Sequence, residues 1–142
     1  MPAVSAGYSA TPLHRKLGIK QGHIVALLGE PAGWRIEDLP ADVLVRRRAR
    51  APLDATIAFF DSRTVLERRL PVLVRALRAD GGLWIAWPRK AAGHVSDISE
   101  DALREIVLPI GLVDVKVAAL DEHWSALKFV WRRERRPKPP SQ

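Results

Sequence analysis

At 142 residues, with 47% hydrophobic residues, the chain is long enough to form one domain around a single core. It contains no cysteine, which excludes disulfides, thiolate metal sites and cysteine nucleophiles. No apolar run approaches the roughly 18 residues that a membrane span needs, and residues 1–10 show no signal-peptide pattern. We therefore expect a cytoplasmic protein with no membrane partner.

The formal net charge of +7 is unevenly distributed along the chain. Residues 132–142 hold five basic side chains and one acid, so we expect a disordered, proline-rich basic tail after a domain that spans 1–131. One dense basic cluster lies within the domain, at Arg46, Arg47, Arg48 and Arg50. Basic runs have a high false-positive rate as nucleic-acid sites, so nucleic-acid binding is a hypothesis that needs further support.

The first part of the chain predicts a short helix and a buried strand. Thr11 can cap the helix, and Gly18 ends it. The apolar run from His23 to Gly29 is continuous instead of alternating, which is typical of an interior strand of a parallel sheet. Residues 34–41 lack helical periodicity, so we expect the first crossover helix to be missing or cut to a turn or two. Val43 to Val45 is a weak strand candidate.

Two more continuous apolar runs, 55–60 and 83–87, predict further buried strands. Between them Leu66, Leu70, Leu73 and Leu77 form one helical stripe. Pro71 inside the stripe predicts either a kink or two shorter helices, and Asp80 to Gly82 predicts a sharp turn before the third strand.

The last third of the chain predicts a helix followed by a hairpin. Ser99 is a candidate N-cap, and core-facing apolar residues follow at Leu103, Ile106, Val107 and Ile110. Beyond Gly111 the pattern has period two, with one face formed by Val113, Val115, Val117 and Ala119 and another by Leu127, Phe129 and Trp131. The chain therefore predicts an α/β fold: a single small Rossmann-like, mostly parallel sheet with an antiparallel C-terminal hairpin.

Two stretches resemble class I S-adenosylmethionine (SAM) methyltransferases. Residues 16–33, KLGIKQGHIVALLGEPAG, are similar to the turn, first strand and glycine-rich loop of that fold, and residues 77–87, LRADGGLWIAW, to a later helix end, double-glycine turn and strand. The resemblance implies a methyltransferase-like fold and SAM as the cofactor. Three features depart from the pattern: Leu27 occupies an acidic position, only Gly29 and Gly33 remain of three glycines, and arginines stand where an acid would hold the ribose.

The whole sequence also resembles a family of short bacterial proteins, a domain family of unknown function. The shared segments are Gly7 to Ser9, Thr11 to Leu13, Gly81 to Pro88, Gly111 to Asp114, and Trp124 with Ser125. This resemblance implies no particular activity.

In a parallel sheet, the carboxyl ends of the strands would gather the candidate site residues on one edge. These are Gly29, Glu30, Gly33, Trp34, Asp61, Ser62, Arg63, Trp87, Arg89 and Lys90. The basic members favour a small anionic ligand, and either tryptophan could cover an aromatic ring. In the alternative interpretation Trp87 fills core, Asp61 or Ser62 caps a helix, and the basic side chains are solvated.

Three functional hypotheses follow. The leading one is a non-enzymatic binding or regulatory module without a cofactor, on a degenerate methyltransferase-like fold. The first alternative is a divergent SAM-dependent methyltransferase that holds its cofactor through Gly29, Gly33 and the strand end at Phe60 and Asp61. The second is a nucleic-acid adaptor that binds through the basic tail. The four histidines show no metal-ligand spacing, so the sequence assigns neither a metal site nor catalytic residues.

Overall fold

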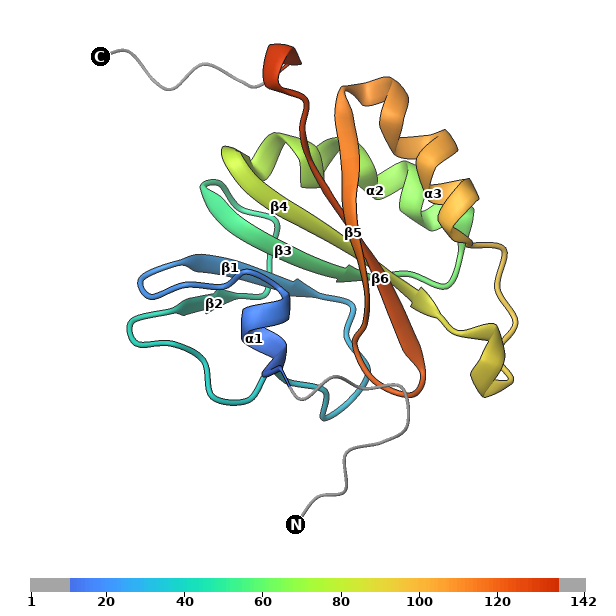
Figure 1. The fold of residues 1–142 in the computed structure, drawn as a ribbon. Helices are drawn as coiled ribbons and strands as arrows, with labels where there is room; N and C mark the ends of the chain where they lie inside the picture. Colours follow the sequence, from blue (N-terminus) through green and yellow to red (C-terminus); the bar gives the residue numbers. More distant parts are fainter. Residues whose placement is uncertain (1–10, 136–142) are drawn as a thin grey trace.

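A six-stranded sheet organises the molecule. The computed structural model describes residues 11–135, and its sheet has the order β2-β1-β3-β4-β6-β5 (Figure 1). The strands are β1 (Ile24–Leu28), β2 (Leu44–Arg46), β3 (Leu53–Phe59), β4 (Leu77–Pro88), β5 (Leu112–Ala119) and β6 (Trp124–Trp131). The first four strands pair in parallel, and β6 pairs antiparallel with both β4 and β5. The predicted α/β class and its antiparallel C-terminal hairpin are confirmed.

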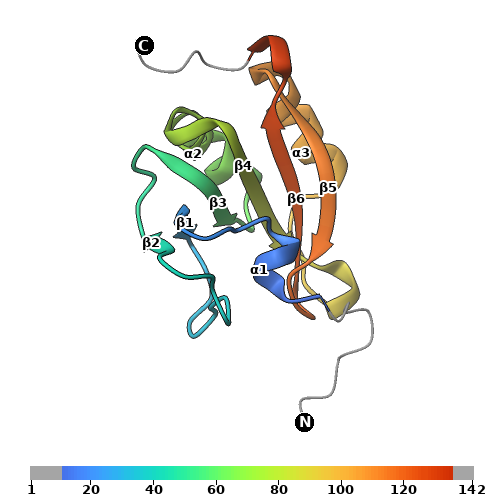
Figure 2. The same ribbon diagram turned by 60° about the vertical axis from the view of Figure 1, so that its left-hand side comes forward.

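Helices cover the two faces of this sheet unequally. The α-helices are α1 (Leu13–Lys16), α2 (Arg63–Ala76) and α3 (Glu100–Val107), and the 3₁₀ turns are η1 (Lys90–Ala92), η2 (Leu108–Ile110) and η3 (Arg133–Arg135). Helices α2 and α3 lie on one face, and α1 lies on the other (Figure 2). Each face has its own buried core, one built on the leucine stripe of α2 and the other around Trp84. In the described part of the chain, no helix has the length and apolar character needed to cross a bilayer.

The connection from β1 to β2 contains no helix. Residues 29–43 form turns and irregular backbone, as the missing periodicity predicts. The weak strand candidate is real: β2 covers three residues, one position further along than expected, and pairs in parallel with β1. A strand this short at the sheet edge is typical of the way proteins limit unwanted edge pairing.

The expected turn at Asp80 to Gly82 is wrong. Helix α2 runs unbroken through Pro71, and β4 begins at Leu77 and continues through both glycines. These glycines serve close packing: a Cβ on Gly81 would lie 3.0 Å from the Leu53 carbonyl oxygen, and one on Gly82 would lie 2.6 Å from Cε of Lys128. The glycine pair therefore marks a crowded stretch of extended backbone.

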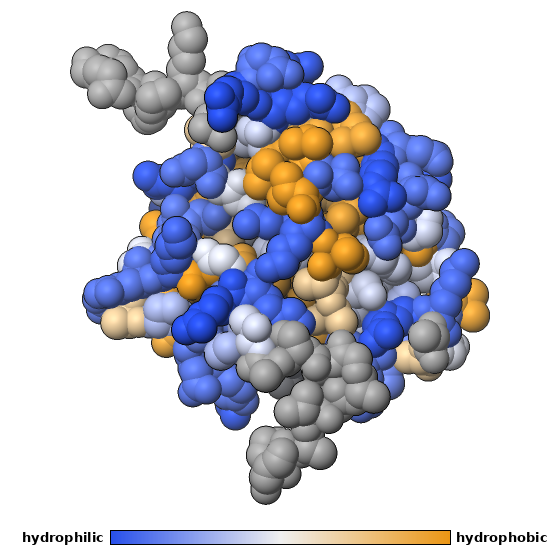
Figure 3. Space-filling model, viewed as in Figure 1, coloured by the Kyte–Doolittle hydropathy of each residue, from blue (hydrophilic) through white to orange (hydrophobic). Residues whose placement is uncertain are grey.

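The predicted valine face of β5 is also wrong, because the register shifts between Asp114 and Lys116. Val115 and Val117 are 55% and 52% exposed, whereas the buried residues of the strand are Leu112 and Ala118. Figure 3 shows the resulting apolar patch over β5. A bulge of this kind re-aims side chains and protects an edge strand from pairing.

The chain stays attached to the fold beyond β6. The Arg132 amide donates to the Gly111 carbonyl at 3.0 Å, and the Arg135 guanidinium donates to the Ile110 carbonyl at 3.2 Å. The first residues of the expected disordered tail are therefore structured, because they extend the hydrogen bonding of the hairpin. The remainder of that tail, 136–142, lies outside the described residues.

Candidate functional site

Three parallel strands end at the same edge of the sheet. The carboxyl ends of β1, β3 and β4 are Leu28, Phe59 and Pro88. From β1 the chain passes to β2 on one side and then to β3 on the other, so the topology reverses between β1 and β3. In open α/β sheets the crevice outside such a reversal is the usual ligand site.

A cavity of about 330 Å³ lies at this reversal, and we call it the switch-point cavity. Its lining comes from the ends of β1 and β3, the residue after β2, and α2: Leu28, Gly29, Arg47, Phe59, Phe60, Asp61, Val65, Arg69 and Leu73. Its charged groups are one carboxylate and two guanidinium groups. Of the predicted site residues, Gly29 and Asp61 lie in this lining.

Gly29 is required by the backbone geometry at this cavity. Its φ is +71°, and a Cβ would lie 2.9 Å from the Phe59 carbonyl oxygen, so only glycine lets the end of β1 approach β3 this closely. Gly33 also has a positive φ, of +80°, but nothing lies within 4 Å of a Cβ built there. The two glycines thus have different roles, and Gly33 lies outside the cavity lining.

Arg47, which follows β2, forms an ion pair with Glu30 in the loop after β1. The Glu30 side chain is 18% exposed, and that of Arg47 is 61% exposed. The acid that would repel an anion at this loop is thereby compensated by the arginine that follows β2. The sequence flagged the arginine cluster, but only the parallel pairing of β2 with β1 brings Arg47 to the site.

Trp34 does not cover the cavity. Its indole N–H donates to Oδ2 of Asp121 at 3.1 Å, and its ring meets Phe59 edge-on at 4.8 Å, within the core on the α1 face. Oδ1 of Asp121 accepts from the backbone amides of His123 and Trp124. Trp34 therefore ties the β1–β2 connection to the β5–β6 turn.

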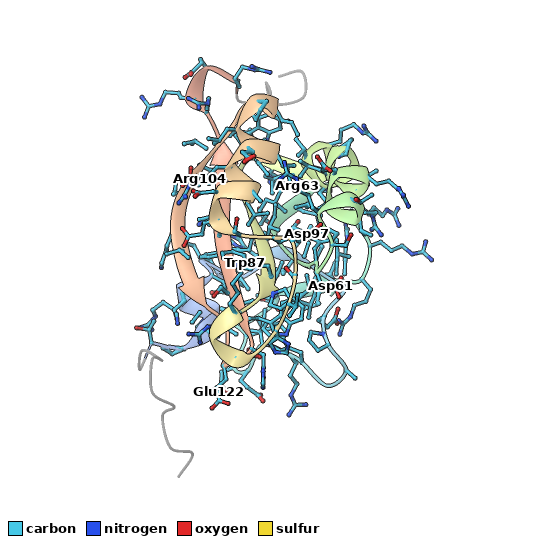
Figure 4. The ribbon with its side chains drawn as sticks, turned by 90° about the vertical axis from the view of Figure 1, so that its right-hand side faces the viewer. Asp61, Arg63, Trp87, Asp97, Arg104 and Glu122 are labelled. Atoms are coloured by element: carbon cyan, nitrogen blue, oxygen red, sulfur yellow. The ribbon has the colours of Figure 1, made fainter. Side chains whose placement is uncertain are left out.

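Ser62 and Arg63 are structural, and Asp61 is not a cap. The Ser62 hydroxyl accepts from the Val65 amide at 3.4 Å, which caps α2 as the alternative interpretation expected. The Arg63 amide donates to Oδ1 of Asp97 at 2.8 Å (Figure 4). The Arg63 guanidinium lies 3.6 Å from the Glu105 carboxylate. Asp61 remains exposed at the cavity.

A second, wider cavity of about 480 Å³ opens beyond β4. Three more of the predicted site residues, Trp87, Arg89 and Lys90, lie in its lining. The rest of the lining comes mainly from the start of α3: Ile98, Ser99, Glu100, Asp101, Arg104 and Ser125. Trp87 is only 9% exposed and belongs to the core under α2 and α3. Five of the ten predicted rim residues are therefore divided between two separate cavities, and the other five lie outside both.

The acidic side chains that line this β4 cavity form ion pairs with Arg104. Arg104 donates to Asp114, Glu100 and Asp101 at 2.9–3.1 Å. The hydrogen bond to Asp114 is the largest cause that raises the pKa of Arg104 above its ordinary value. Because two acids of the lining face this arginine, the cavity is a weaker anion site than its basic residues suggest.

No metal centre is formed by the described residues, among which no three His, Cys, Asp or Glu side chains cluster. His94 and His123 share a hydrogen bond, with Nε2 and Nδ1 3.0 Å apart, which links the loop after β4 to the β5–β6 turn. The sequence could not predict this contact, since the two histidines lie in separate loops.

Solved structures of SAM-dependent methyltransferases have a similar fold. The chain matches a SAM-dependent methyltransferase from Aquifex aeolicus with a TM-score of 0.55 at 15% identity, over 81% of this chain and 85% of that one. It matches the Methanococcus jannaschii fibrillarin pre-rRNA processing protein with a TM-score of 0.55 at 13% identity, over 87% and 70%. The DhpI–SAH complex matches with a TM-score of 0.55 at 12% identity, over 86% and 83%.

These identities establish the fold alone. No protein-family model matches the chain, and no curated protein matches it in sequence. The architecture is therefore a methyltransferase-like Rossmann fold, as the resemblance implied.

Proposed function

We propose that this chain is a divergent SAM-dependent methyltransferase domain that holds its cofactor in the switch-point cavity. The observation that carries the proposal is the position of that cavity, at the carboxyl ends of β1 and β3 where the strand order reverses. The similar solved structures support this hypothesis better than the non-enzymatic module that the sequence favoured.

The charges of the cavity fit a zwitterionic nucleoside. SAM carries a carboxylate, an ammonium group and ribose hydroxyls. The Arg69 guanidinium is exposed, has no ion pair among residues 11–135, and would bind the carboxylate. The Asp61 carboxylate, also without a partner in the described chain, would accept hydrogen bonds from the ammonium group or the ribose. The half-buried Phe60 supplies an apolar surface.

Asp61 would replace the ribose-binding acid that the methyltransferase pattern has at the end of the second strand. In this chain β2 ends in Arg46, with two more arginines following. The one carboxylate of the cavity lining, Asp61, follows the end of β3, on the other side of β1. A volume of about 330 Å³ lies near the lower end of the usual range for small-molecule sites, roughly 300–1,000 Å³.

When bound, SAM supplies a methyl group activated by its sulfonium, and transfer of that methyl to an acceptor leaves S-adenosylhomocysteine (SAH). The chain's own residues would orient the cofactor and hold its charged groups. The β4 cavity opens on the same edge of the sheet, so it is the candidate position for an acceptor.

Calorimetric titration with SAM and SAH tests the proposal. We expect saturable binding, weakened about tenfold or more in Asp61→Asn, which corresponds to about 1.4 kcal/mol. Asp80→Asn is the matched control, because this exposed aspartate lies in a different cavity, at the amino edge of the sheet. Ligand at about 100 times its dissociation constant should also add about 2.7 kcal/mol of stability and raise the unfolding midpoint by several degrees.

The absence of both heat and thermal shift at millimolar SAM and SAH would overturn the proposal. Equal loss of affinity in Asp61→Asn and Asp80→Asn would contradict the assigned site. Binding of SAH without methyl release from SAM, whatever the acceptor offered, would favour the non-enzymatic module.

A further inference from the structure

One surface of the molecule carries a strong excess of arginine, and of its five arginines only Arg69 also lines the proposed cofactor site. Helix α2 turns its leucines toward the sheet, and its outer side carries Arg68, Arg69 and Arg75. The crossover from β2 to β3 adds Arg48 and Arg50. All five are exposed, and we call them together the arginine face. Figure 4 shows nitrogen-tipped side chains projecting outward from α2.

The crossover and α2 run side by side across the same face of the sheet. At the carboxyl edge Arg47 and Arg69 line one cavity. Midway, Ala49 packs against the core cluster that contains the α2 leucines. At the amino edge Leu53, which follows the crossover, pairs with Leu77, which follows α2. The five arginines therefore belong to one continuous surface, although they come from two segments of the chain.

The acids near this surface do not neutralise its positive charge. Glu30 pairs with Arg47, Asp54 with Arg78, and Glu67 with Arg63. Asp61 lines the same cavity as Arg69 but forms no ion pair with it. Within residues 11–135 no ion pair engages the five members of the arginine face. Their positive potential is thus directed to solvent along a helix of 14 residues, which is about 21 Å long.

We propose that the arginine face is a docking surface for the phosphate backbone of a nucleic acid. Guanidinium groups match phosphate oxygens with two hydrogen bonds each and stay charged at any physiological pH. A row of such groups without base-reading side chains between them predicts binding that depends little on sequence and strongly on salt. The inference does not depend on the cofactor, but a backbone held there would pass beside the switch-point cavity, since Arg69 lies in both.

Fluorescence anisotropy with labelled oligonucleotides of about 20 residues tests the inference across salt from about 50 to 200 mM. Single-stranded RNA, single-stranded DNA and duplex DNA are titrated separately, and the one that binds with the highest affinity identifies the kind of nucleic acid. Neutralisation of about five phosphates predicts a slope of log affinity against log salt of about −3.5 for single strands and about −4.5 for a duplex.

The decisive variant combines Arg48→Gln, Arg50→Gln, Arg68→Gln and Arg75→Gln, none of which lines the switch-point cavity. We expect at least a tenfold loss of affinity and a slope shallower by about 3. The control removes the same charge from the end of the chain through Arg132→Gln, Arg133→Gln, Arg136→Gln and Lys138→Gln. It should keep affinity within about threefold of the parent protein.

Equal loss in both variants would show a dependence on net charge alone and overturn the inference. So would the absence of binding at low salt, or displacement of the oligonucleotide by polyglutamate at equal charge, which would indicate an acidic protein partner instead. Unfolding midpoints confirm that both variants fold. Titration with SAH is expected to be unchanged in both, so failure of this inference is separable from failure of the cofactor site.

Discussion

The connections that leave the sheet after β1 and after β4 differ in what holds them. The connection after β4 contains α3, which is capped by Ser99 and packs Leu103 and Val107 into the core. The connection after β1 has no helix and is held by the ion pair of Glu30 and the hydrogen bond of Trp34. The connection from β1 to β2 is therefore held by the close approach of Gly29 to β3 and by polar contacts, in place of a buried helix.

The strongest test of this difference is at the start of the helix-free connection. Gly29→Ala places a Cβ against the Phe59 carbonyl at a positive φ, so we expect a loss of about 2–4 kcal/mol in the free energy of unfolding. Gly33→Ala has the same backbone strain without a steric contact, and should cost about 1 kcal/mol. Urea denaturation measures both. Equal losses would mean that the close approach of β1 to β3 contributes nothing.

On the other connection, the cap of α3 is the feature to remove. The Ser99 hydroxyl accepts from the Ala102 amide at 3.1 Å. Ser99→Ala should lower the free energy of unfolding by about 1 kcal/mol, measured by urea denaturation. An unchanged stability would show that acids in the first turn of α3 suffice, and the contrast between the two connections would weaken.

Trp34→Phe should have a smaller, local effect. The change keeps an aromatic ring near Phe59 but removes the donor to Asp121, for an expected cost of about 0.5–1 kcal/mol. Amide hydrogen exchange should accelerate in residues 29–43 and in the β5–β6 turn, and stay unchanged in α3. Faster exchange spread evenly over the sheet would contradict the claim that Trp34 holds the β1–β2 connection to the β5–β6 turn.

The smallest effect concerns Lys128, on the α1 face far from both connections. Burial is the main cause that lowers its pKa below the ordinary lysine value, and the charges of Lys116 and Lys20 add to it. The unfolded chain then binds a proton at this lysine more readily than the folded chain does. The free energy of unfolding therefore rises as the pH increases from the lowered pKa toward about 10.4, the ordinary lysine value, and falls as the pH drops back through that interval.

Lys128→Met keeps the apolar stem beside Gly82 but removes the ammonium group, whose Nζ lies 5.8 Å from the centre of the Trp84 ring. We expect its unfolding midpoint to exceed that of the parent protein slightly near neutral pH, with a difference that shrinks as the pH rises. A difference independent of pH would show that the side chain acts through packing alone.

The sequence predicts the sheet well where local patterns suffice. Continuous apolar runs identified β1, β3 and β4, and the serine before a first-turn acid identified the cap of α3. The glycines at 81 and 82 misled the prediction, since their role is set by Lys128 and Leu53, which are distant in sequence. The bulge in β5 likewise depends on its pairing with β6.

The candidate site was predicted in part for the same reason. Gly29 and Asp61 follow directly from where strands end, and both lie in the switch-point cavity. Arg47 and Arg69 were missed, because one reaches the cavity through the pairing of β2 and the other through the direction in which α2 crosses the sheet. Trp34 was assigned to the site, but the distant Asp121 holds it on the opposite face.

The position of the cofactor site is the central claim, and backbone amide chemical shifts on titration with SAH test it most directly. We predict shifts concentrated at Gly29, Phe60 and Asp61 and on the first turns of α2, with little change at Gly93 or in β5. Shifts that gather instead around Lys90 and Ser99, or no shifts at millimolar SAH, would contradict the account.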